Sequence, residues 1–336
     1  MTLVSSVLLL GAGAIPAVSI PLAQAATLAG KPILPLRKPD GHVLRNIRQQ
    51  VISGNWSGYV VARYKTGQAY TQATAHWIVP AVSAPAAGTT GYSSSWLGIG
   101  GFCENSTCTH VDRTLIQLGT EQDAAPGAVT QYYAWYEALP GPEVPIQGLS
   151  IAAGDEVTAA LVDGPSSAKG PASRQSAPAA HGPGAPAPGK APGAPPPAAP
   201  PAPGGGPPGN GHQGGPGPGK GQTWTLSLTV TDPATGQTQS WSTSLQYDSS
   251  LDSAEWIEEA PTVNGSIAPL ANFGQVTFDP GSADGTGPGL VTTDGVVMYD
   301  PQGQTSNPSA PDSDADGFAA CWGAGTQLTA CAAPPS

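Results

Sequence analysis

The chain alternates apolar and polar residues over many short stretches, which is the pattern of half-buried β-strands. In residues 73–79, ATAHWIV, one face would carry only apolar side chains, Ala73, Ala75, Trp77 and Val79. Residues 223–232, TWTLSLTVTD, repeat the pattern with Trp224, Leu226, Leu228 and Val230 on one face. Gly, Pro and Asn separate the stretches, and a helical period is hard to find. The pattern therefore predicts an all-β fold, an antiparallel β-sandwich.

The turn DPATG at 232–236 predicts one hairpin directly. It joins the stretch 223–232 to a second alternating stretch, QTQSWSTSLQY at 237–247. Turn residues between two alternating runs are typical of a β-hairpin. The aromatic stretch QYYAWYEA at 131–138 predicts a further strand, since its side chains also alternate between two faces.

Residues 165–222 interrupt the strands with a low-complexity stretch. Pro, Gly and Ala make up 44 of these 58 residues, and no large apolar side chain is present to build a core. This composition predicts a disordered or polyproline-like segment. Because strand patterns flank it on both sides, we expect a long loop inserted into one domain, 54–336. The alternative is a linker between two domains, but neither half supplies enough strands to cover both faces of a sandwich.

The N-terminus has the features of an export signal. Residues 7–14 form an apolar run, and Ala23-Gln24-Ala25 has the small-x-small form of a cleavage site. Residues 1–25 are therefore predicted to be a signal peptide, and the protein is predicted to be secreted and extracellular. A membrane anchor is the alternative, although Pro16 and Pro21 interrupt the run, which is short for a span.

Charge divides the rest of the chain into a basic segment and an acidic body. Residues 26–53 carry five basic residues and one acid, which suggests a pro-segment, with a disordered tail as the alternative. The body, 54–164 and 223–336, has three basic residues against 22 acidic ones, a charge of −19 with neutral histidines. Attraction between the two predicts that the segment rests on the body at neutral pH.

So negative a body excludes two classes of partner. It repels nucleic acid, and it repels anionic membranes once the signal peptide has been removed. It suits an acidic medium, in which many of its carboxyl groups are protonated. We expect a monomer.

Four cysteines fit an oxidising compartment and predict two short disulfide loops. Local pairing would join Cys103 to Cys108 and Cys321 to Cys331. We expect no metal and no cofactor, because the cysteine spacings are not those of a zinc site and the histidines have no partner at ligand spacing. Three sequons for N-glycosylation begin at Asn55, Asn105 and Asn264.

The stretch SAEWIEEAP at 253–261 puts three carboxylates beside a tryptophan. The strand period places Glu255 and Glu259 on one face. In RTLIQLG at 113–119 the same period places Gln117 on a largely apolar face. An ordinary hydrogen-bonded glutamine and a solvated edge glutamate are the alternatives. The sequence has no GxSxG motif, no HExxH motif and no Gly-rich phosphate loop.

Six stretches occur together in a fixed order along the predicted domain. They are NWSGYV (55–60), SSWLGIGG (94–101), LIQLGTEQ (115–122), YYAWYEALP (132–140), AEWIEEAP (254–261) and PLANFGQVTF (269–278). In this order they resemble the glutamic peptidases, the eqolisins. The resemblance implies a sandwich of two large antiparallel sheets, of the concanavalin or lectin-like type. It also implies an endopeptidase that cleaves proteins or peptides at acid pH.

The resemblance implies a catalytic dyad of Gln117 and Glu259 that activates one water molecule. A carboxylate with an ordinary pKa is ionised in mild acid and can take a proton from water. A glutamine amide stays neutral at every working pH, and its NH2 can donate to a developing oxyanion. Glu255 competes with Glu259 for the role of base, because both share a strand face.

The resemblance implies further residues near the cleft. Trp56 and Trp96 would line it, and Glu121 and Glu137 would contact the substrate. One position departs from the family pattern, since some members have Asp where this sequence has Gly100. That departure bears on subsite preference.

The alternative function is a secreted carbohydrate-binding or glycoside-hydrolysing sandwich. Paired carboxylates beside aromatic rings also serve sugar hydrolysis. A glycosidase needs two carboxyl groups flanking one bond, whereas LIQLG supplies the amide of Gln117. The amide therefore favours the peptidase.

Overall fold

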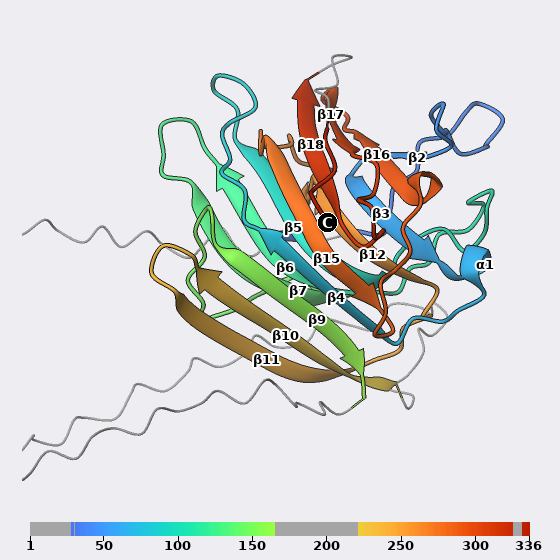
Figure 1. The fold of residues 1–336 in the computed structure, drawn as a ribbon. Helices are drawn as coiled ribbons and strands as arrows, with labels where there is room; N and C mark the ends of the chain where they lie inside the picture. Colours follow the sequence, from blue (N-terminus) through green and yellow to red (C-terminus); the bar gives the residue numbers. More distant parts are fainter. Residues whose placement is uncertain (1–27, 30, 165–220, 325–330) are drawn as a thin grey trace, which may run out of the picture. The chain divides into compact units, whose positions relative to one another are not determined.

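The computed structural model describes residues 28–29, 31–164, 221–324 and 331–336 of the chain (Figure 1). The predicted signal peptide, 1–25, lies outside the described residues, and so does nearly all of the predicted insert, 165–222. Strand β10 begins at Gln222, at the very end of the range predicted for the insert.

The described domain consists of two facing layers of antiparallel strands (Figure 1). One layer contains, in order, β11 (Gln237–Tyr247), β10 (Gln222–Asp232), β9 (Glu156–Asp163), β4 (Gln72–Ile78), β15 (Gln275–Ala283) and β18 (Phe318–Ala324). The other contains β3 (Trp56–Ala62), β12 (Ser253–Glu259), β5 (Gly91–Gly100), β6 (Leu115–Ala124), β7 (Gln131–Ala138) and β8 (Val144–Pro145). The layers are joined through β17 (Gln304–Pro308) and β16 (Gly295–Tyr299). The predicted antiparallel β-sandwich is confirmed.

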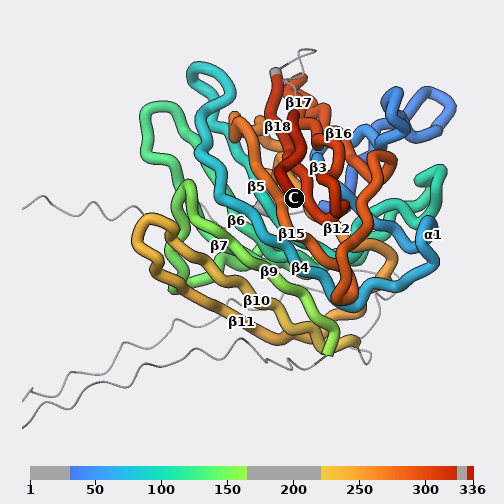
Figure 2. Tube along the Cα trace, in the orientation of Figure 1, coloured from blue at the N-terminus to red at the C-terminus, as the bar shows by residue number. Residues whose placement is uncertain are grey.

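Short elements complete the described part of the chain. Strand β2 (Val51–Ser53) pairs in parallel with β16, which brings the N-terminal part of the chain beside its C-terminal part (Figure 2). A separate small sheet contains β1 (Leu28–Ala29), β13 (Thr262–Val263) and β14 (Ser266–Ile267). The helical elements are α1 (Arg63–Thr66) and the 3-10 turn η2 (Thr292–Asp294). No helix among the described residues is long and apolar enough to cross a membrane.

The predicted strand faces agree with the structure. In β4 the alternate residues Ala73, Ala75 and Trp77 are buried, and the residues between them are more exposed. In β10 the predicted apolar side chains are all buried. Strands β10 and β11 pair as the predicted hairpin, with Asp232 opposite Gln237 at the turn.

The main hydrophobic core lies between the two layers. Trp77 of β4 donates its indole N–H to Thr120 Oγ1 of β6 at 3.1 Å, and Trp256 of β12 donates to the carbonyl of Thr74 at 2.8 Å. These bonds cross the sandwich, and they satisfy polar groups that would be costly to bury alone. Each large apolar side chain buried here stabilises the fold by about 1.5–3 kcal/mol.

A second, smaller apolar cluster lies on the opposite, outer face of the layer that contains β3, β12, β5, β6 and β7. The strands contribute Trp56, Val60, Trp96, Leu115, Trp135 and Ile257. The chain before β3 adds Ile33, Val43 and Val51. The N-terminal segment, residues 31–53, therefore packs against this outer face, which points away from the other layer.

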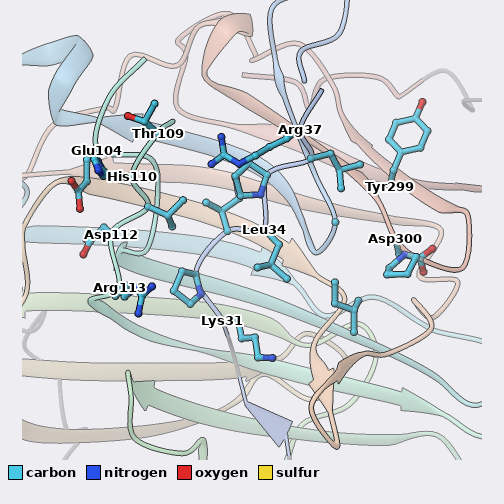
Figure 3. A pocket seen from close by; sticks show the side chains of 18 of the residues that line it. Lys31, Leu34, Arg37, Glu104, Thr109, His110, Asp112, Arg113, Tyr299 and Asp300 are labelled. Carbon is cyan, nitrogen blue, oxygen red and sulfur yellow. The ribbon is translucent and has the colours of Figure 1, made fainter. Parts of the chain in front are cut away.

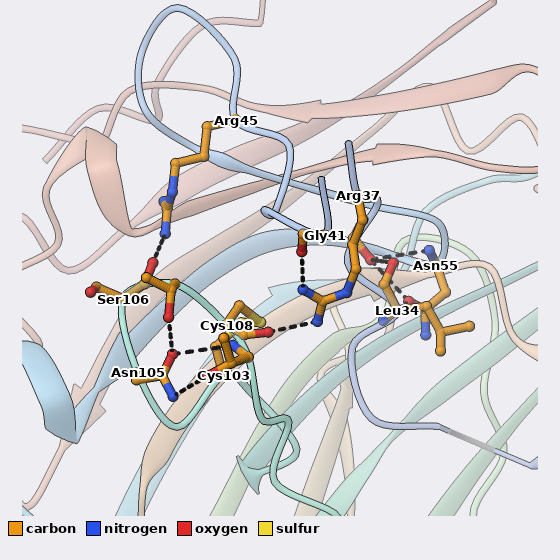
Figure 4. The surroundings of a disulfide bond; sticks show 12 residues. Leu34, Arg37, Gly41, Arg45, Asn55, Cys103, Asn105, Ser106 and Cys108 are labelled. Atoms are coloured by element: carbon orange, nitrogen blue, oxygen red, sulfur yellow. Dashed lines mark hydrogen bonds between the residues drawn. A yellow bond between two sulfur atoms is a disulfide. The ribbon is translucent and has the colours of Figure 1, made fainter. Parts of the chain in front are cut away.

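Both disulfides are local, as predicted. Cys103 pairs with Cys108 and Cys321 pairs with Cys331. The first closes a short loop between β5 and β6, next to the N-terminal segment (Figure 4). The second joins β18 to the C-terminal residues.

Candidate active site

Four adjacent strands bring the predicted polar residues onto the outer face in two cross-strand rows. One row contains Glu255, Gly98, Gln117 and Glu137. The other row contains Glu259, Ser94, Glu121 and Tyr133. Trp96 lies in the row between them, opposite Ile257 and Gly119. The predicted residues Gln117, Glu259, Glu121 and Glu137 thus belong to the two rows, and Trp96 lies between them. Trp56 of β3 pairs with Glu259.

Two glycines explain why the tryptophan fits between the rows. A Cβ atom at Gly119 would lie 2.5 Å from Trp96 Cβ and 2.4 Å from the carbonyl oxygen of Ser95. A Cβ atom at Gly98 would lie 2.7 Å from the Trp96 ring and 2.9 Å from a carboxylate oxygen of Glu255. Larger residues at these positions would therefore push the ring and the carboxylate away.

Glu259 is buried and has both carboxylate oxygens in hydrogen bonds. Asn55 Nδ2 donates to Oε1 at 3.2 Å, and Trp96 Nε1 donates to Oε2 at 2.9 Å. Burial raises the pKa of Glu259 well above its ordinary value, and the charge of Glu137 raises it further. The donors from Asn55 and Trp96 oppose that rise, because they stabilise the charged form.

Gln117 is fully buried, and Glu137 fixes its amide. Gln117 Nε2 donates to Glu137 Oε2 at 2.7 Å. No donor in the described part of the chain reaches Gln117 Oε1. An amide nitrogen carries two N–H groups, so one remains for another acceptor while Glu137 holds the first.

The two predicted cleft tryptophans pack edge to face. The ring centroids of Trp56 and Trp96 lie 4.9 Å apart at an interplanar angle of 77°, a favourable aromatic geometry. Both rings are buried in the outer cluster. They form an apolar wall beside Glu259, which strengthens any electrostatic interaction there.

Glu121 lies in a group of acidic side chains at the end of the site towards Asp123. Burial raises the pKa of Glu121, and the charges of Asp123 and Glu143 raise it further. Burial also raises the pKa of Asp123 to about 6 and that of Glu143 to about 8. This group is neutral in acid, so it can offer hydroxyl donors as well as carbonyl acceptors.

Glu255, the competing base, is also buried on this face. Its pKa is raised by burial, and the first group that opposes the rise is the Ser253 hydroxyl. It shares the cross-strand row of Gln117, whereas Glu259 is bonded to Asn55 and Trp96 and feels the charge of Glu137.

The N-terminal segment binds to this face through its backbone. Ile33 N donates to the carbonyl of Gly101 at 3.0 Å, and Leu34 N donates to Asn55 Oδ1 at 2.9 Å (Figure 4). Gly54 N donates back to the carbonyl of Leu34 at 2.8 Å. The Ile33 side chain is 1% exposed within the cluster that contains Trp56 and Trp96. The segment therefore packs beside Trp56 and Trp96, on the same face that carries the predicted dyad.

Arg37 and Arg45 of the segment bond to carbonyl groups rather than to carboxylates. Arg37 donates to the carbonyl of Cys108 at 2.6 Å, and Arg45 donates to that of Ser106 at 3.0 Å (Figure 4). Among the described residues, the ion pairs are Arg63–Asp252 and Lys65–Asp294, and neither involves the segment. The attraction predicted from net charge is thus not carried by direct ion pairs.

One groove of the described domain lies at the edge of the segment, away from the dyad. It has a volume of about 1520 Å³ and is lined by residues 31–37, 109–114 and 299–301, among others (Figure 3). Neither Gln117 nor Glu259 lines it. Residues 31–37 of the segment form one wall of the groove, whereas Gln117 and Glu259 are buried outside it.

One acidic group in the described part has metal-ligand spacing. Ligand atoms of Asp279, Asp312 and Asp316 lie within 4.8 Å of one another. These residues belong to β15 and to the loop before β18, so they are not part of the outer face that carries Gln117 and Glu259.

Three residues of the site were not predicted from the sequence. Asn55 was noted as a sequon and as the first residue of the stretch NWSGYV, without a role in the site, but its side chain is buried and bonded to Glu259, which leaves no room for a glycan there. Asp123 and Glu143 join Glu121. Two features of the sequence could have indicated these residues. Asn55 directly precedes Trp56, and Asp123 lies on the strand face of Gln117.

Comparison with known proteins gives the family. The model of the Peptidase A4 family matches residues 54–172 and 220–317. Aspergillopepsin-2 of Aspergillus niger is 25% identical over 297 residues, which cover 81% of each chain.

Two similar solved structures are also glutamic peptidases by their titles. Scytalido-glutamic peptidase with a transition state analog inhibitor has a TM-score of 0.46 and 16% identity, over 80% of this chain and 98% of that one. The aspergilloglutamic peptidase from Aspergillus niger has a TM-score of 0.40 and 20% identity, over 69% and 99%. On the strength of the family match, the chain belongs to the Peptidase A4 family and is a glutamic endopeptidase.

Proposed function

We propose that this peptidase cleaves proteins or peptides in acid with Glu259 as general base and then general acid, and with Gln117 as the oxyanion donor. One observation supports this best. Fixed neutral donors hold both oxygens of Glu259, and the amide of Gln117 is bonded to Glu137, whose charge acts on Glu259. Membership of a peptidase family argues against the carbohydrate-active alternative.

The chemistry follows from the two residue types. Ionised Glu259 takes a proton from one water molecule, and the water oxygen attacks the carbonyl carbon of the peptide bond. The negative charge that develops on the carbonyl oxygen is stabilised by the second N–H of Gln117. When the C–N bond breaks, Glu259 returns the proton to the leaving amine. No net proton is consumed by the enzyme.

The raised pKa of Glu259 links activity to the N-terminal segment. A protonated carboxyl group cannot accept a proton from water, so burial holds the base inactive in acid. Moving the segment off the outer face admits water and lowers the pKa of Glu259 towards its ordinary range near 4. Glu259 then becomes a competent base in acid.

We also propose the division of the chain that the sequence predicts. Residues 1–25 serve as the signal for export to the extracellular space, and 26–53 contain a pro-segment. Residues 165–221, up to the start of β10 at Gln222, are a loop within one domain. Burial of Ile33 over the site supports the pro-segment. Pairing of β2 with β16 favours a removable part that ends before Val51.

Substitution of the dyad tests the mechanism. Glu259→Gln removes the base and should lower kcat/KM on a denatured protein substrate at about pH 4 by about 10²–10⁴-fold. Gln117→Ala should lower it by about 10²–10³-fold. Glu258→Gln is the matched control, because this neighbour is equally buried but bonds to Ser95 on the opposite face.

The competing base is tested by Glu255→Gln. We expect this variant to keep much more activity than Glu259→Gln. A folded Glu259→Gln enzyme with full activity, together with an inactive Glu255→Gln enzyme, would transfer the role to Glu255. Circular dichroism and thermal unfolding check that each variant is folded.

A further inference from the structure

Asn55 is a buried amide at the point where the N-terminal segment meets β3. Its side chain is fully buried, and hydrogen bonds to three different residues hold it (Figure 4 shows its contact with Leu34). Asn55 is also bonded through its backbone, since Ala260 N donates to the carbonyl of Asn55 at 2.9 Å. It therefore contacts both Glu259 and the residue that follows it.

The neighbours of Asn55 fix which end of its amide faces Glu259. Leu34 N and Ser53 Oγ both donate to Oδ1, each at 2.9 Å. Two donors at one end require an acceptor there, so the other end must be the NH2 group. That NH2 donates to Glu259 Oε1 at 3.2 Å.

Glu259 needs such a donor because its surroundings oppose its charge. It is 1% exposed, and the nearby titratable group whose charge acts on it is Glu137 of β7. Glu255 shares its strand face and Glu121 shares its cross-strand row. Lysine or arginine would stabilise the carboxylate too strongly for a base, whereas a neutral amide donates equally at every pH.

We propose that Asn55 is a positioning residue for the catalytic glutamate: its amide holds one oxygen of Glu259, keeps the carboxylate oriented and favours its ionised form. This inference rests on the proposed role of Glu259 as base. Trp96 holds the other oxygen, so the two donors together fix the plane of the carboxylate.

The pH profile separates this role from a merely structural one. Asn55→Ala removes the donor, and the acidic limb of kcat/KM should move to higher pH by about one unit, the effect of one lost hydrogen bond to a charged group. Asn55→Asp keeps the shape but places a second carboxyl group beside Glu259. The acidic limb of kcat/KM in Asn55→Asp should move to higher pH by more than it does in Asn55→Ala.

Gln122→Ala is the matched control. Gln122 is also a fully buried amide, but it bonds to Thr120 and Ser93 rather than to Glu259. This variant should lose thermal stability as Asn55→Ala does, with no movement of the acidic limb. An unmoved limb in both Asn55 variants would overturn the proposal, and Asn55→Asp serves alone if Asn55→Ala does not fold.

Failure of the role proposed for Asn55 can be distinguished from failure of the role proposed for Glu259. If Glu259→Gln remains active, the base has been assigned wrongly and the proposed function fails. If Glu259→Gln is inactive but neither Asn55 variant shifts the limb, the mechanism stands and the role of Asn55 alone is lost.

Discussion

Glu258 and Glu259 are neighbours on β12, yet they point to opposite faces of one layer. Glu258 faces the core between the layers and accepts a hydrogen bond from Ser95 Oγ at 2.5 Å. Glu259 faces outward and accepts bonds from Asn55 and Trp96. Both are buried, and burial raises the pKa of both.

The difference lies in what buries them. Glu258 is covered by the facing strands of the sandwich, which are part of the folded domain. Glu259 lies on the outer face, against which the basic segment 31–53 packs through few hydrogen bonds. A carboxyl group buried in the core is a fixed feature of the fold, whereas removal of the proposed pro-segment would change the surroundings of Glu259 alone.

The largest expected effect is on the free energy of unfolding, when apolar side chains on the two faces are truncated. Leu97→Ala creates a cavity in the inner core and should lower the free energy of unfolding by about 2–5 kcal/mol, measured by chemical denaturation. Ile33→Ala is a comparable truncation in the N-terminal segment. It should chiefly raise hydrogen exchange on the outer face. Equal losses of global stability in both variants would mean that the segment folds as one unit with the sandwich.

A smaller effect concerns pH and Glu258. Burial raises its pKa to about 8, so the folded protein keeps this proton while the unfolded chain loses it above its ordinary pKa. Stability from this group is therefore present at acid pH and is lost as the pH rises from about 4.5 to 8. Glu258→Gln should flatten that decline by a few kcal/mol, measured by urea unfolding at pH 5 and pH 8. A decline as steep as in the wild type would contradict this.

The smallest effect concerns Arg37 of the N-terminal segment. Arg37 donates hydrogen bonds to the carbonyl groups of Cys108 and Gly41. Arg37→Met should therefore make the free energy of binding of the segment to the enzyme less favourable by about 1 kcal/mol. The measurement is inhibition of the enzyme by a synthetic peptide of residues 31–50, with and without the substitution. Steep weakening by salt would instead favour diffuse attraction to the acidic body.

The sequence predicted the strands and their faces because a period of two residues is a local property. The inner face of β4 and the shared face of Glu255 and Glu259 both follow from it. Cross-strand register is not local. That Gln117 shares a row with Glu255, through Gly98, depends on the pairing of three strands far apart in the chain.

The contacts of single polar side chains were harder still to predict. Asn55 and Glu259 are 204 residues apart, and only their tertiary pairing brings amide and carboxylate together. The family resemblance selected Gln117 and Glu259 by position in a motif, but it gave no partner for either. The carbonyl contacts of Arg37 and Arg45 could not be inferred from net charge, which counts charges without their neighbours.

Strand β2 has a practical consequence for recombinant production of the enzyme. Its residues Val51–Ser53 pair with Val296–Met298 of β16, and Ser53 Oγ donates to Asn55. A recombinant protein that starts at Gly54 would leave that backbone edge open to aggregation and would remove a support of the Asn55 amide. One that starts at Val51 retains both, so the yield of folded protein and its shelf life should depend on three residues that lie before the family domain.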